Sequence, residues 1–227
     1  MAYVFAPPRQ PALPIRGSDQ LFPVHRIYCV GRNYAEHARE MGSDPDREPP
    51  FFFQKNADNV VTSGTLPYPS QTSDLHFEIE LVVALKSGGA NIEAADALAH
   101  VYGYAVGLDM TRRDLQNAAK KTGRPWEVGK AFERSAPCTP IVPAAAIGHP
   151  SKGSIWIDVN GERRQTGDLA KMIWDIPHQI AFLSALFELA AGDLIFTGTP
   201  AGVGSTKAGD RLHGHVDGVG DLKVVVG

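Results

Sequence analysis

The stretch from Asp74 to Leu85 constrains the fold of this 227-residue chain more than any other. Because successive side chains leave a strand on opposite faces, Glu78 and Glu80 share one face of the strand that it predicts. The opposite face is apolar at every second position, which is the period of a β-strand: Leu75, Phe77, Ile79, Leu81, Val83 and Leu85. The glutamate face continues as Val82 and Ala84, so we expect the two carboxylates at the edge of the interior.

The pair of carboxylates needs a positive partner. Like charges held close together in a partly dry place repel each other unless a proton or a cation joins them. The stretch itself contains no Lys or Arg before Lys86. Converging oxygen donors suit a hard divalent cation such as Mg2+. The plainer alternative, favoured by this pattern taken alone, is an ordinary solvated strand face.

The composition limits the classes of protein to consider. Hydrophobic residues make up 43% of the chain and charged residues 21%, as in a soluble globular protein with a substantial core. The 23 glycines and 17 prolines predict many turns and therefore a β-rich fold. A net charge of −3 gives no electrostatic argument for nucleic acid or an anionic membrane surface. The most apolar later stretch, 176–196, is interrupted by charged residues and is too broken to span a bilayer.

The cysteines and the N-terminal segment bear on the cellular compartment. Cys29 and Cys138 have no disulfide-framework or zinc-site spacing, so we expect a reducing compartment, the cytoplasm. No apolar signal segment opens the sequence. Residues 1–20 are proline-rich and typical of an extended arm, which can pack on its own domain or on a partner subunit. We expect residues 21–227 to form one domain.

The segment 33–42 predicts a short helix with Asn33 as its N-cap, Glu36 as in a capping box and a closing glycine. His37 and Glu40 lie three apart on one helical face, where a carboxylate can fix the imidazole tautomer and create a general base. A surface His–Glu pair is the plainer alternative. A helix this short is marginal by itself and compatible with a mobile lid.

A third acidic residue, Asp109, stands where a predicted strand, 101–108, meets a predicted helix, 111–121, with a capping box. It could complete a three-carboxylate site, although aspartate is also common in plain turns. Arg113 and Gln116 lie at i and i+3 on one face of this helix, and we expect that face to point to the same side as Asp109.

Two lysines and a glycine-rich turn are further candidates. Lys55 ends an apolar strand, either as a solvated strand end or as a cation near an anionic substrate. Lys130 lies in mainly apolar surroundings, and a buried lysine needs a carboxylate or a bound anion nearby. The glycines around Gly198 follow a strand, 194–196, and allow backbone N–H groups to approach a carboxylate.

The remaining elements are predicted from propensity and turn chemistry. They are a helix over 91–100, a strand over 155–159 with a hairpin turn at 160–161, an apolar-striped helix from 176 to a stop at Gly192, and a β-rich tail.

Five motifs occur in a fixed order along the chain. They are Cys29-Val30-Gly31-Arg32-Asn33-Tyr34, His76-Phe77-Glu78-Ile79-Glu80, Gly107-Leu108-Asp109-Met110-Thr111-Arg112-Arg113-Asp114-Leu115-Gln116, Gly129-Lys130 and Phe196-Thr197-Gly198-Thr199-Pro200. Together they resemble the fumarylacetoacetate hydrolase family over roughly residues 25 to 225. The segments 51–55, 167–169 and 172–174 are most similar to its fumarylpyruvate hydrolase branch. Asp168-Leu169 departs from many relatives and weakly separates the chain from decarboxylase-type members.

The resemblance implies a mainly β fold with some α, a mixed β-sandwich or β-roll with short peripheral helices, and a homodimer. By motif match it implies Mg2+ or Mn2+ ligands at Glu78, Glu80 and Asp109. It implies catalytic roles for His37 and Glu40 on a lid helix, and for Lys130. The positions implied to hold the substrate are Arg32, Lys55, Arg113, Gln116, Gly198 and Thr199.

The implied reaction is hydrolysis of the carbon–carbon bond of an acylpyruvate, with fumarylpyruvate of gentisate-type aromatic catabolism as the expected substrate. Glu40 would orient His37, which deprotonates a water that attacks the acyl carbonyl. Lys130 and Gln116 would help a metal to stabilise the oxyanion and the departing pyruvate enolate.

Two alternatives remain open at this point. The same metal site could serve a decarboxylase or tautomerase of oxaloacetate, because those reactions also pass through an enolate. A non-enzymatic β-rich module could use the three carboxylates as a structural cation site. The residues do not identify the pocket for the distal carboxylate of fumarylpyruvate, for which Arg32, Lys55 and Arg124 are candidate cations.

Overall fold

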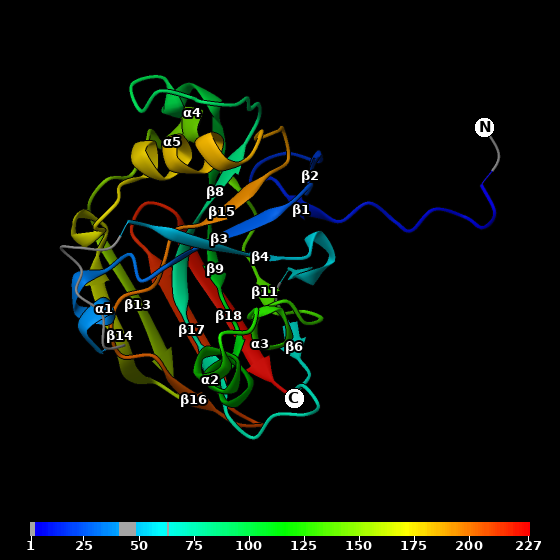
Figure 1. Ribbon diagram of the computed structural model, residues 1–227, viewed down its shortest axis with the longest axis vertical. Helices are drawn as coiled ribbons and strands as arrows, with labels where there is room; N and C mark the ends of the chain where they lie inside the picture. Colours follow the sequence, from blue (N-terminus) through cyan, green and yellow to red (C-terminus); the bar gives the residue numbers. More distant parts are fainter. Residues whose placement is uncertain (1–2, 41–48, 63) are drawn as a thin grey trace.

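The computed structural model describes residues 3–40, 49–62 and 64–227, and residues 38–40 by their backbone only. Two large sheets form its body (Figure 1). The six-stranded sheet has the order β12 (Val142–Pro143), β9 (Val101–Leu108), β8 (Ile79–Leu85), β15 (Leu194–Phe196), β3 (Ile27–Gly31) and β4 (Phe51–Lys55). The five-stranded sheet has the order β14 (Glu162–Asp168), β13 (Ser154–Val159), β17 (Arg211–Val216), β18 (Gly220–Val226) and β6 (Gly64–Leu66). The expectation of a mainly β fold with short helices is confirmed.

Three small sheets and the helices surround this body. The small sheets are β1 (Ala12–Pro14) with β2 (Leu21–Pro23), β5 (Val60–Val61) with β11 (Ala136–Pro137), and β10 (Thr111–Arg112), β7 (Leu75–Phe77) and β16 (Gly204–Thr206). The α-helices are α1 (Ala35–Glu40), α2 (Arg113–Thr122), α3 (Glu127–Lys130), α4 (Ala144–Ile147) and α5 (Ile176–Leu186). Short 3-10 turns are η1 (Ala57–Asn59), η2 (Ala97–His100) and η3 (Leu169–Lys171). Among the described residues, no helix is both long and apolar enough to cross a membrane.

Strand β8 is buried on both of its faces, because hydrophobic clusters lie on either side of the six-stranded sheet. Leu81 and Val83 belong to the larger cluster, which also contains residues of the five-stranded sheet. Val82 and Ala84 belong to a second cluster with residues of β3 and β15. This double burial explains why the glutamate face of the strand continues as apolar residues.

The single strand predicted over 74–85 is in fact two strands. The ladder is interrupted at Glu78, and β7 and β8 belong to different sheets. The period-two pattern runs on across the interruption, so it could not reveal that the partner strands change there. The interruption lies at one of the predicted metal ligands.

Three helix predictions are corrected by tertiary contacts. In place of a helix over 91–100 there is only η2, because the backbone N–H groups of Asn91 and Ile92 donate to Ser184 of α5. Helix α2 begins at Arg113 without a side-chain cap, since the Thr111 hydroxyl donates instead to the carbonyl of Asp109. Helix α5 ends at Leu186 and not at Gly192, because the chain turns to an extended conformation at the next residue.

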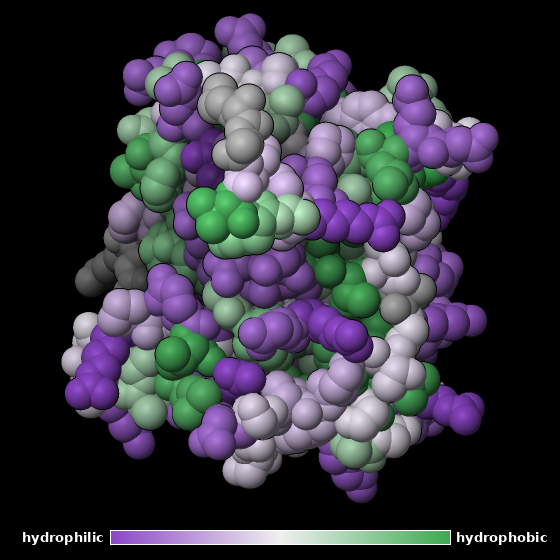
Figure 2. Space-filling view, turned by 90° about the vertical axis from the view of Figure 1, so that its right-hand side faces the viewer, coloured by the Kyte–Doolittle hydropathy of each residue, from purple (hydrophilic) through white to green (hydrophobic). Residues whose placement is uncertain are grey.

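The predicted N-terminal arm, residues 1–20, is divided. The segment from Tyr3 to Phe5 extends away from the body (Figure 1). Its side chains are apolar and exposed. Leu13 and Ile15 are buried, and β1 pairs with β2, so the later part of the segment packs on the core. The face toward which the arm projects carries interspersed hydrophilic and hydrophobic residues (Figure 2).

Candidate metal centre and pocket

Three acidic side chains meet where β8 and β9 lie side by side. Glu80 is paired across the ladder with Gly107, and the N–H of Asp109 donates to the carbonyl of Glu78 at 2.9 Å. One carboxylate oxygen from each of Glu78, Glu80 and Asp109 lies within 4.8 Å of the other two, and all three residues are buried. Backbone pairing of two neighbouring strands therefore brings together the three acids that the sequence singled out.

Two buried cations hold Glu78. Lys130 Nζ donates to Glu78 Oε2 at 2.9 Å, and Arg113 forms an ion pair with Glu78 Oε1. Lys130 also donates to Asp109 Oδ2 at 2.6 Å and to the Thr111 hydroxyl at 2.7 Å, so these three bonds match the three N–H groups of the ammonium. The expectation that Lys130 needs a carboxylate nearby is confirmed.

A third cation, Lys55, lies on the far side of Asp109. Its Nζ is 2.7 Å from Asp109 Oδ1 and donates to the backbone carbonyls of Met110 and Lys130. Its side chain has no exposed surface and does not line the pocket described below. Lys55 therefore lies where it supports a candidate metal ligand, and its expected contact with substrate has no counterpart in the lining of this pocket.

Glu80 differs from the other two acids. The N–H of Gly198 donates to Glu80 Oε2 at 2.8 Å, and no ion pair of Glu80 occurs among the described residues. Burial, together with the negative charges of Asp109 and Glu78, raises the pKa of Glu80 well above its ordinary value. Burial also acts to raise the pKa of Glu78, but Lys130 and Arg113 outweigh it and hold that pKa well below its ordinary value.

These donors fit a divalent metal. Three carboxylates offer hard oxygen ligands at one point. Glu80 carries a charge that burial and its acidic neighbours disfavour, and a cation at this point would relieve that cost. Lys55, Lys130 and Arg113 carry as many positive charges as the three acids carry negative charges when all three are ionised. A dication would therefore make the base of the pocket net positive.

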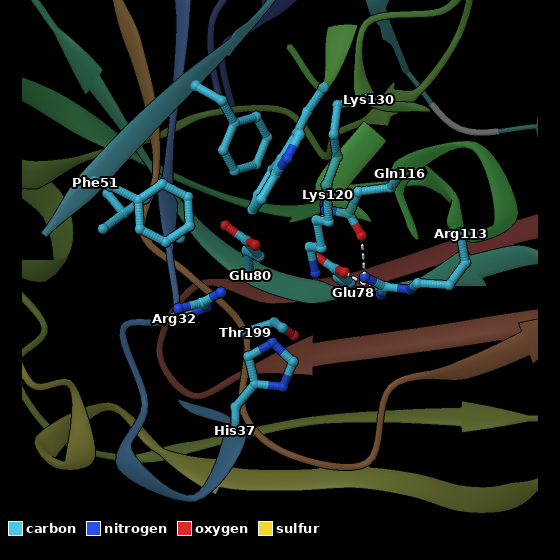
Figure 3. A pocket seen from close by; sticks show the side chains of 14 residues that line it. Arg32, His37, Phe51, Glu78, Glu80, Arg113, Gln116, Lys120, Lys130 and Thr199 are labelled. Carbon is cyan, nitrogen blue, oxygen red and sulfur yellow. Dashed lines mark hydrogen bonds and ion pairs between the residues drawn. The ribbon is translucent and has the colours of Figure 1, made fainter. Parts of the chain in front are cut away.

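The acids lie at the base of a pocket that Figure 3 shows from close by. Glu78 and Glu80 line it, while Asp109 lies behind them without exposed surface. The remaining lining residues are mostly aromatic, cationic or polar: Arg32, His37, Phe51, Phe53, Arg113, Gln116, Lys120, Trp126, Lys130 and Thr199, with Val30 and Gly31. A pocket with acids only at its base and basic groups around them is suited to an anionic ligand that also binds a metal.

Helix α1 brings His37 to this pocket. The imidazole is buried and points toward Thr199 and the glutamates (Figure 3), and its proximity helps to lower the pKa of Glu78. Glu40 is the last residue of α1, but its side chain and the residues from 41 to 48 lie outside the described part of the chain. Asn33, predicted to cap the helix, has a buried side chain that bonds the backbone of Trp174 and Thr197.

The glycine-rich turn after β15 binds one of the candidate metal ligands through a backbone N–H. Gly198 has a positive φ of 98°, and a Cβ there would lie 2.7 Å from that of Asn33, so the position requires glycine. Its N–H donates to Glu80, and a contact of Gly198 with substrate stays a prediction. The Thr199 hydroxyl donates to the carbonyl of Ile79 at 2.7 Å and so fixes this turn to β8.

Arg113 and Gln116 meet as the helical spacing predicted. Arg113 Nη1 donates to Gln116 Oε1 at 2.6 Å, which fixes the orientation of the amide beside the pocket. Sequence reasoning missed Lys120, which follows Gln116 by four residues on the same face and also lines the pocket. That spacing was the available signal. Arg124, by contrast, is exposed and does not line the pocket.

A second missed residue is Gln165 of β14. Its side chain is fully buried, accepts from the N–H of Ile79 at 3.1 Å and donates to the Thr199 hydroxyl at 2.8 Å and to the Pro200 carbonyl at 2.7 Å. It thereby ties the start of β8 to the turn after β15. No local pattern marks it, because its partners are distant in sequence.

The family profile described as fumarylacetoacetate (FAA) hydrolase C-terminal matches residues 26–227. The chain therefore belongs to the fumarylacetoacetate hydrolase family, as its motifs predicted, and its class is that of hydrolases acting on carbon–carbon bonds.

Particular relatives refine this placement. The fumarylpyruvate hydrolase of Ralstonia sp is 43% identical over 190 residues, which cover 82% of this chain and 98% of the relative. The mitochondrial oxaloacetate tautomerase of Mus musculus is 42% identical over 200 residues, covering 88% and 90%. The crystal structure of fumarylpyruvate hydrolase from Pseudomonas aeruginosa, in complex with Mn2+ and pyruvate, superimposes with a TM-score of 0.98 at 55% identity, covering 99% of each chain. The expected fold of the family is thus confirmed.

Proposed function

We propose that this protein hydrolyses an acylpyruvate, with fumarylpyruvate cleaved to fumarate and pyruvate in aromatic catabolism of the gentisate type. One observation carries the proposal: a buried three-carboxylate cluster forms the base of a pocket whose other charged lining groups are basic. The relatives named fumarylpyruvate hydrolase support the choice of substrate.

The charge of the pocket supports an anionic substrate. Three buried acids and three buried cations balance at its base, so a bound dication would leave an excess of about two positive charges there. Fumarylpyruvate carries two carboxylates, one beside the diketone and one at the far end of the acyl group. Its charge therefore complements the metal-loaded pocket.

Mg2+ or Mn2+, held by Glu78, Glu80 and Asp109, would supply Lewis-acid polarisation of the substrate oxygens and stabilise negative charge. The protein's own groups carry the proton transfers. His37, oriented by Glu40, takes a proton from a water whose oxygen adds to the acyl carbonyl. The bond between the acyl carbon and the methylene carbon of the pyruvate part then breaks, and its electron pair leaves as the pyruvate enolate. The imidazolium returns the proton to that carbon.

We assign the cations around the acids to different tasks. The three N–H groups of Lys130 donate to Glu78, Asp109 and Thr111. We therefore propose that Lys130 fixes the acids and offsets their charge. Gln116, whose amide is oriented by Arg113, and the backbone at Thr199 are the groups proposed to contact the pyruvoyl end of the substrate. The proposed lid over about 33–42 would bring His37 and Glu40 to the site.

A second candidate is the tautomerisation or decarboxylation of oxaloacetate on the same carboxylates. It is favoured by relatives named oxaloacetate tautomerase at identities close to that of the fumarylpyruvate hydrolase. A structural cation site without catalysis is a third possibility, but it gives no role to His37, Gln116 or Lys130 at the pocket. Under that third proposal, chelation would lower the melting temperature of a protein that has no turnover.

One side-by-side assay separates these candidates. Fumarylpyruvate, acetylpyruvate and oxaloacetate are each incubated with the protein and Mg2+ or Mn2+. Acylpyruvate hydrolysis predicts loss of the diketone ultraviolet band with fumarate and pyruvate formed in equal amounts. A higher kcat/KM for oxaloacetate, with enol–keto exchange or release of carbon dioxide, would overturn the proposal.

We further propose that the protein is a cytoplasmic homodimer. The exposed apolar side chains of Tyr3, Val4 and Phe5 on the projecting arm support a second copy as their partner. The free, buried thiols of Cys29 and Cys138 suit a reducing compartment. If the protein is a dimer, light scattering should give a mass near 49 kDa, about twice the 24.4 kDa of one chain. A mass near that of one chain would contradict the dimer.

A further inference from the structure

One wall of the pocket is built from aromatic rings with cations stacked on them. The Arg32 guanidinium lies 5.4 Å from the ring centre of Phe51, and Lys120 Nζ lies 4.9 Å from that of Trp126. The two rings meet edge to face, with centres 5.3 Å apart. Phe53 continues the wall beside Trp126 at 5.7 Å and carries Lys130 at 4.9 Å. The wall therefore presents flat apolar surface together with positive charge.

Lys120 differs from the cations at the base of the pocket. It lies on α2, half-buried, and among the ion pairs of the described residues none involves it. Its ammonium group lies over the ring of Trp126. Figure 3 shows its side chain reaching toward the space above the two glutamates. A cation held in this way is available to an anionic group of a ligand.

Arg32 approaches the same space from the opposite side. Its backbone has a φ of 57°, a left-handed conformation that an arginine rarely adopts and that costs free energy. Figure 3 shows the guanidinium below Phe51 and Glu80, on the side of the pocket where Thr199 lies. A strained backbone that delivers a charged side chain into a pocket is typical of a functional position.

The other cations considered for a distal carboxylate are engaged elsewhere. Lys55 lies behind Asp109 without exposed side-chain surface. Arg113 pairs with Glu78 and Gln116. Arg124 is exposed and does not line the pocket. Lys120, held over Trp126, is thus a lining cation that can meet a second carboxylate, and Arg32 lines the same pocket.

We propose that Lys120, together with Arg32, binds the distal carboxylate of a dicarboxylic acylpyruvate, whose planar unsaturated acyl group lies along Phe51 and Trp126. This inference deepens the proposed function and rests on it, because it assigns the part of the pocket that distinguishes fumarylpyruvate from a shorter monocarboxylic acylpyruvate.

The electrostatics of Lys120 agree with this role. Burial, and then the charges of Arg113 and Arg32, lower its pKa to about 8, against a smaller opposing effect of Glu78. Lys130 lowers it further. A positive charge placed in half-dry surroundings among other cations is costly, and an arriving carboxylate would offset that cost. The site is therefore arranged to gain most when the ligand supplies a second negative charge.

Kinetic discrimination between two acylpyruvates tests the assignment. We expect K120M to lower the kcat/KM ratio of fumarylpyruvate to acetylpyruvate about 10- to 100-fold, mainly through KM, since a charge-assisted hydrogen bond is lost. K120R should keep most of the ratio. K121M, which removes an exposed lysine one position further along α2, is the matched control and should keep all of it. An unchanged ratio in K120M would overturn the assignment.

A binding measurement keeps this test separate from the proposed reaction. Fumarate and crotonate differ in one carboxylate, which is a methyl group in crotonate, and both can be titrated calorimetrically into the Mg2+-loaded protein without turnover. Wild-type protein should bind fumarate at least about tenfold more tightly, and K120M should lose that preference. Equal affinities in the wild type would contradict the subsite. If the preference is present but acylpyruvates are not cleaved, the subsite stands and the proposed function fails.

Discussion

The base of the pocket and its rim differ in how their charged groups are paired. The base consists of Glu78, Glu80 and Asp109, and the rim of Lys120 and Arg32 over the aromatic wall. At the base, Glu78 and Asp109 are buried and each is bonded to cations that are buried too. At the rim, Lys120 and Arg32 lie over aromatic rings, and Lys120 forms no ion pair among the described residues. Glu78 and Asp109 thus have cationic partners within the protein, whereas Lys120 would gain its counter-charge from the proposed ligand.

Under the proposals above, the base carries the chemistry and the rim selects the substrate. Removing one partner from a buried, bonded charge leaves the other uncompensated, so the base tolerates little change. Replacing Lys120, which lies over a ring and has no ion pair among the described residues, would remove only the proposed contact with the ligand. Relatives named for hydrolysis and for tautomerisation have similar identities to this chain, so overall identity does not select between the two reactions.

The largest expected effect comes from the base. Glu80 lacks an ion pair among the described residues, so its charge is the one that a metal would match. We expect E80Q to abolish tight Mn2+ binding and to lower kcat at least about a thousandfold, because both ligand charge and Lewis-acid chemistry are lost. Calorimetry and steady-state kinetics measure the two losses. E133Q, on an exposed glutamate, is the control. Stoichiometric Mn2+ binding by E80Q would contradict the role of Glu80 as a metal ligand at the base.

The proposed base catalyst gives the next effect. H37A and E40Q should lower kcat about 10²- to 10⁴-fold while the Kd for Mn2+ stays within about threefold of the wild-type value, since neither group is a proposed ligand. E36Q, on an exposed residue of the same helix, should behave as wild type. If either His37 or Glu40 can be replaced with kcat near the wild-type value, the assignment of the pair is wrong.

A stability measurement sharpens the description of the base. Gln165 bonds the N–H of Ile79 and the hydroxyl of Thr199 in a fully buried position. Q165L should lower the free energy of unfolding by about 1–3 kcal/mol, because these buried polar groups lose their partner. Urea unfolding followed by fluorescence reports the change, with Q20L as an exposed control. A value within about 0.5 kcal/mol of the control would show that the tie between β8 and the turn is dispensable.

The smallest effect is a pH dependence at the rim. Lys120, with a pKa of about 8, is charged below that pH and loses its charge above it. The groups that act on it are Arg113, Arg32, Glu78 and Lys130. The fumarylpyruvate-to-acetylpyruvate ratio of kcat/KM should therefore fall about fourfold between pH 7 and 8.5 in the wild type, following the protonated fraction. In K120R it should stay level. The same slope in both proteins would assign the titration to another group.

The base could be predicted from the sequence largely because its residues follow local rules. Period two places Glu78 and Glu80 on one face, a strand end presents Asp109, and helical spacing joins Arg113 to Gln116. The break between β7 and β8 escaped prediction, because an apolar alternation does not reveal which sheet each part joins. Lys130 was expected to need an acid, but only the fold supplies both Glu78 and Asp109.

The rim was hardly predictable. Phe51 and Trp126 come from segments more than 70 residues apart, and their meeting depends on how α3 packs against β4. Lys120 follows Gln116 by one helical turn, but the same spacing on an exposed helix marks only a solvated lysine. Gln165 could not be found at all, since its partners lie in β8 and after β15.

The central claim, that water is added across the carbon–carbon bond of an acylpyruvate at this centre, is tested most directly with oxygen-18 water. Fumarylpyruvate is cleaved by the Mg2+-loaded protein in this solvent, and the products are analysed by mass spectrometry beside an enzyme-free exchange control. The account predicts one solvent oxygen in the new carboxylate of fumarate for each pyruvate released, and no carbon dioxide. Intact diketone with only solvent exchange of protons, or release of carbon dioxide, would contradict it.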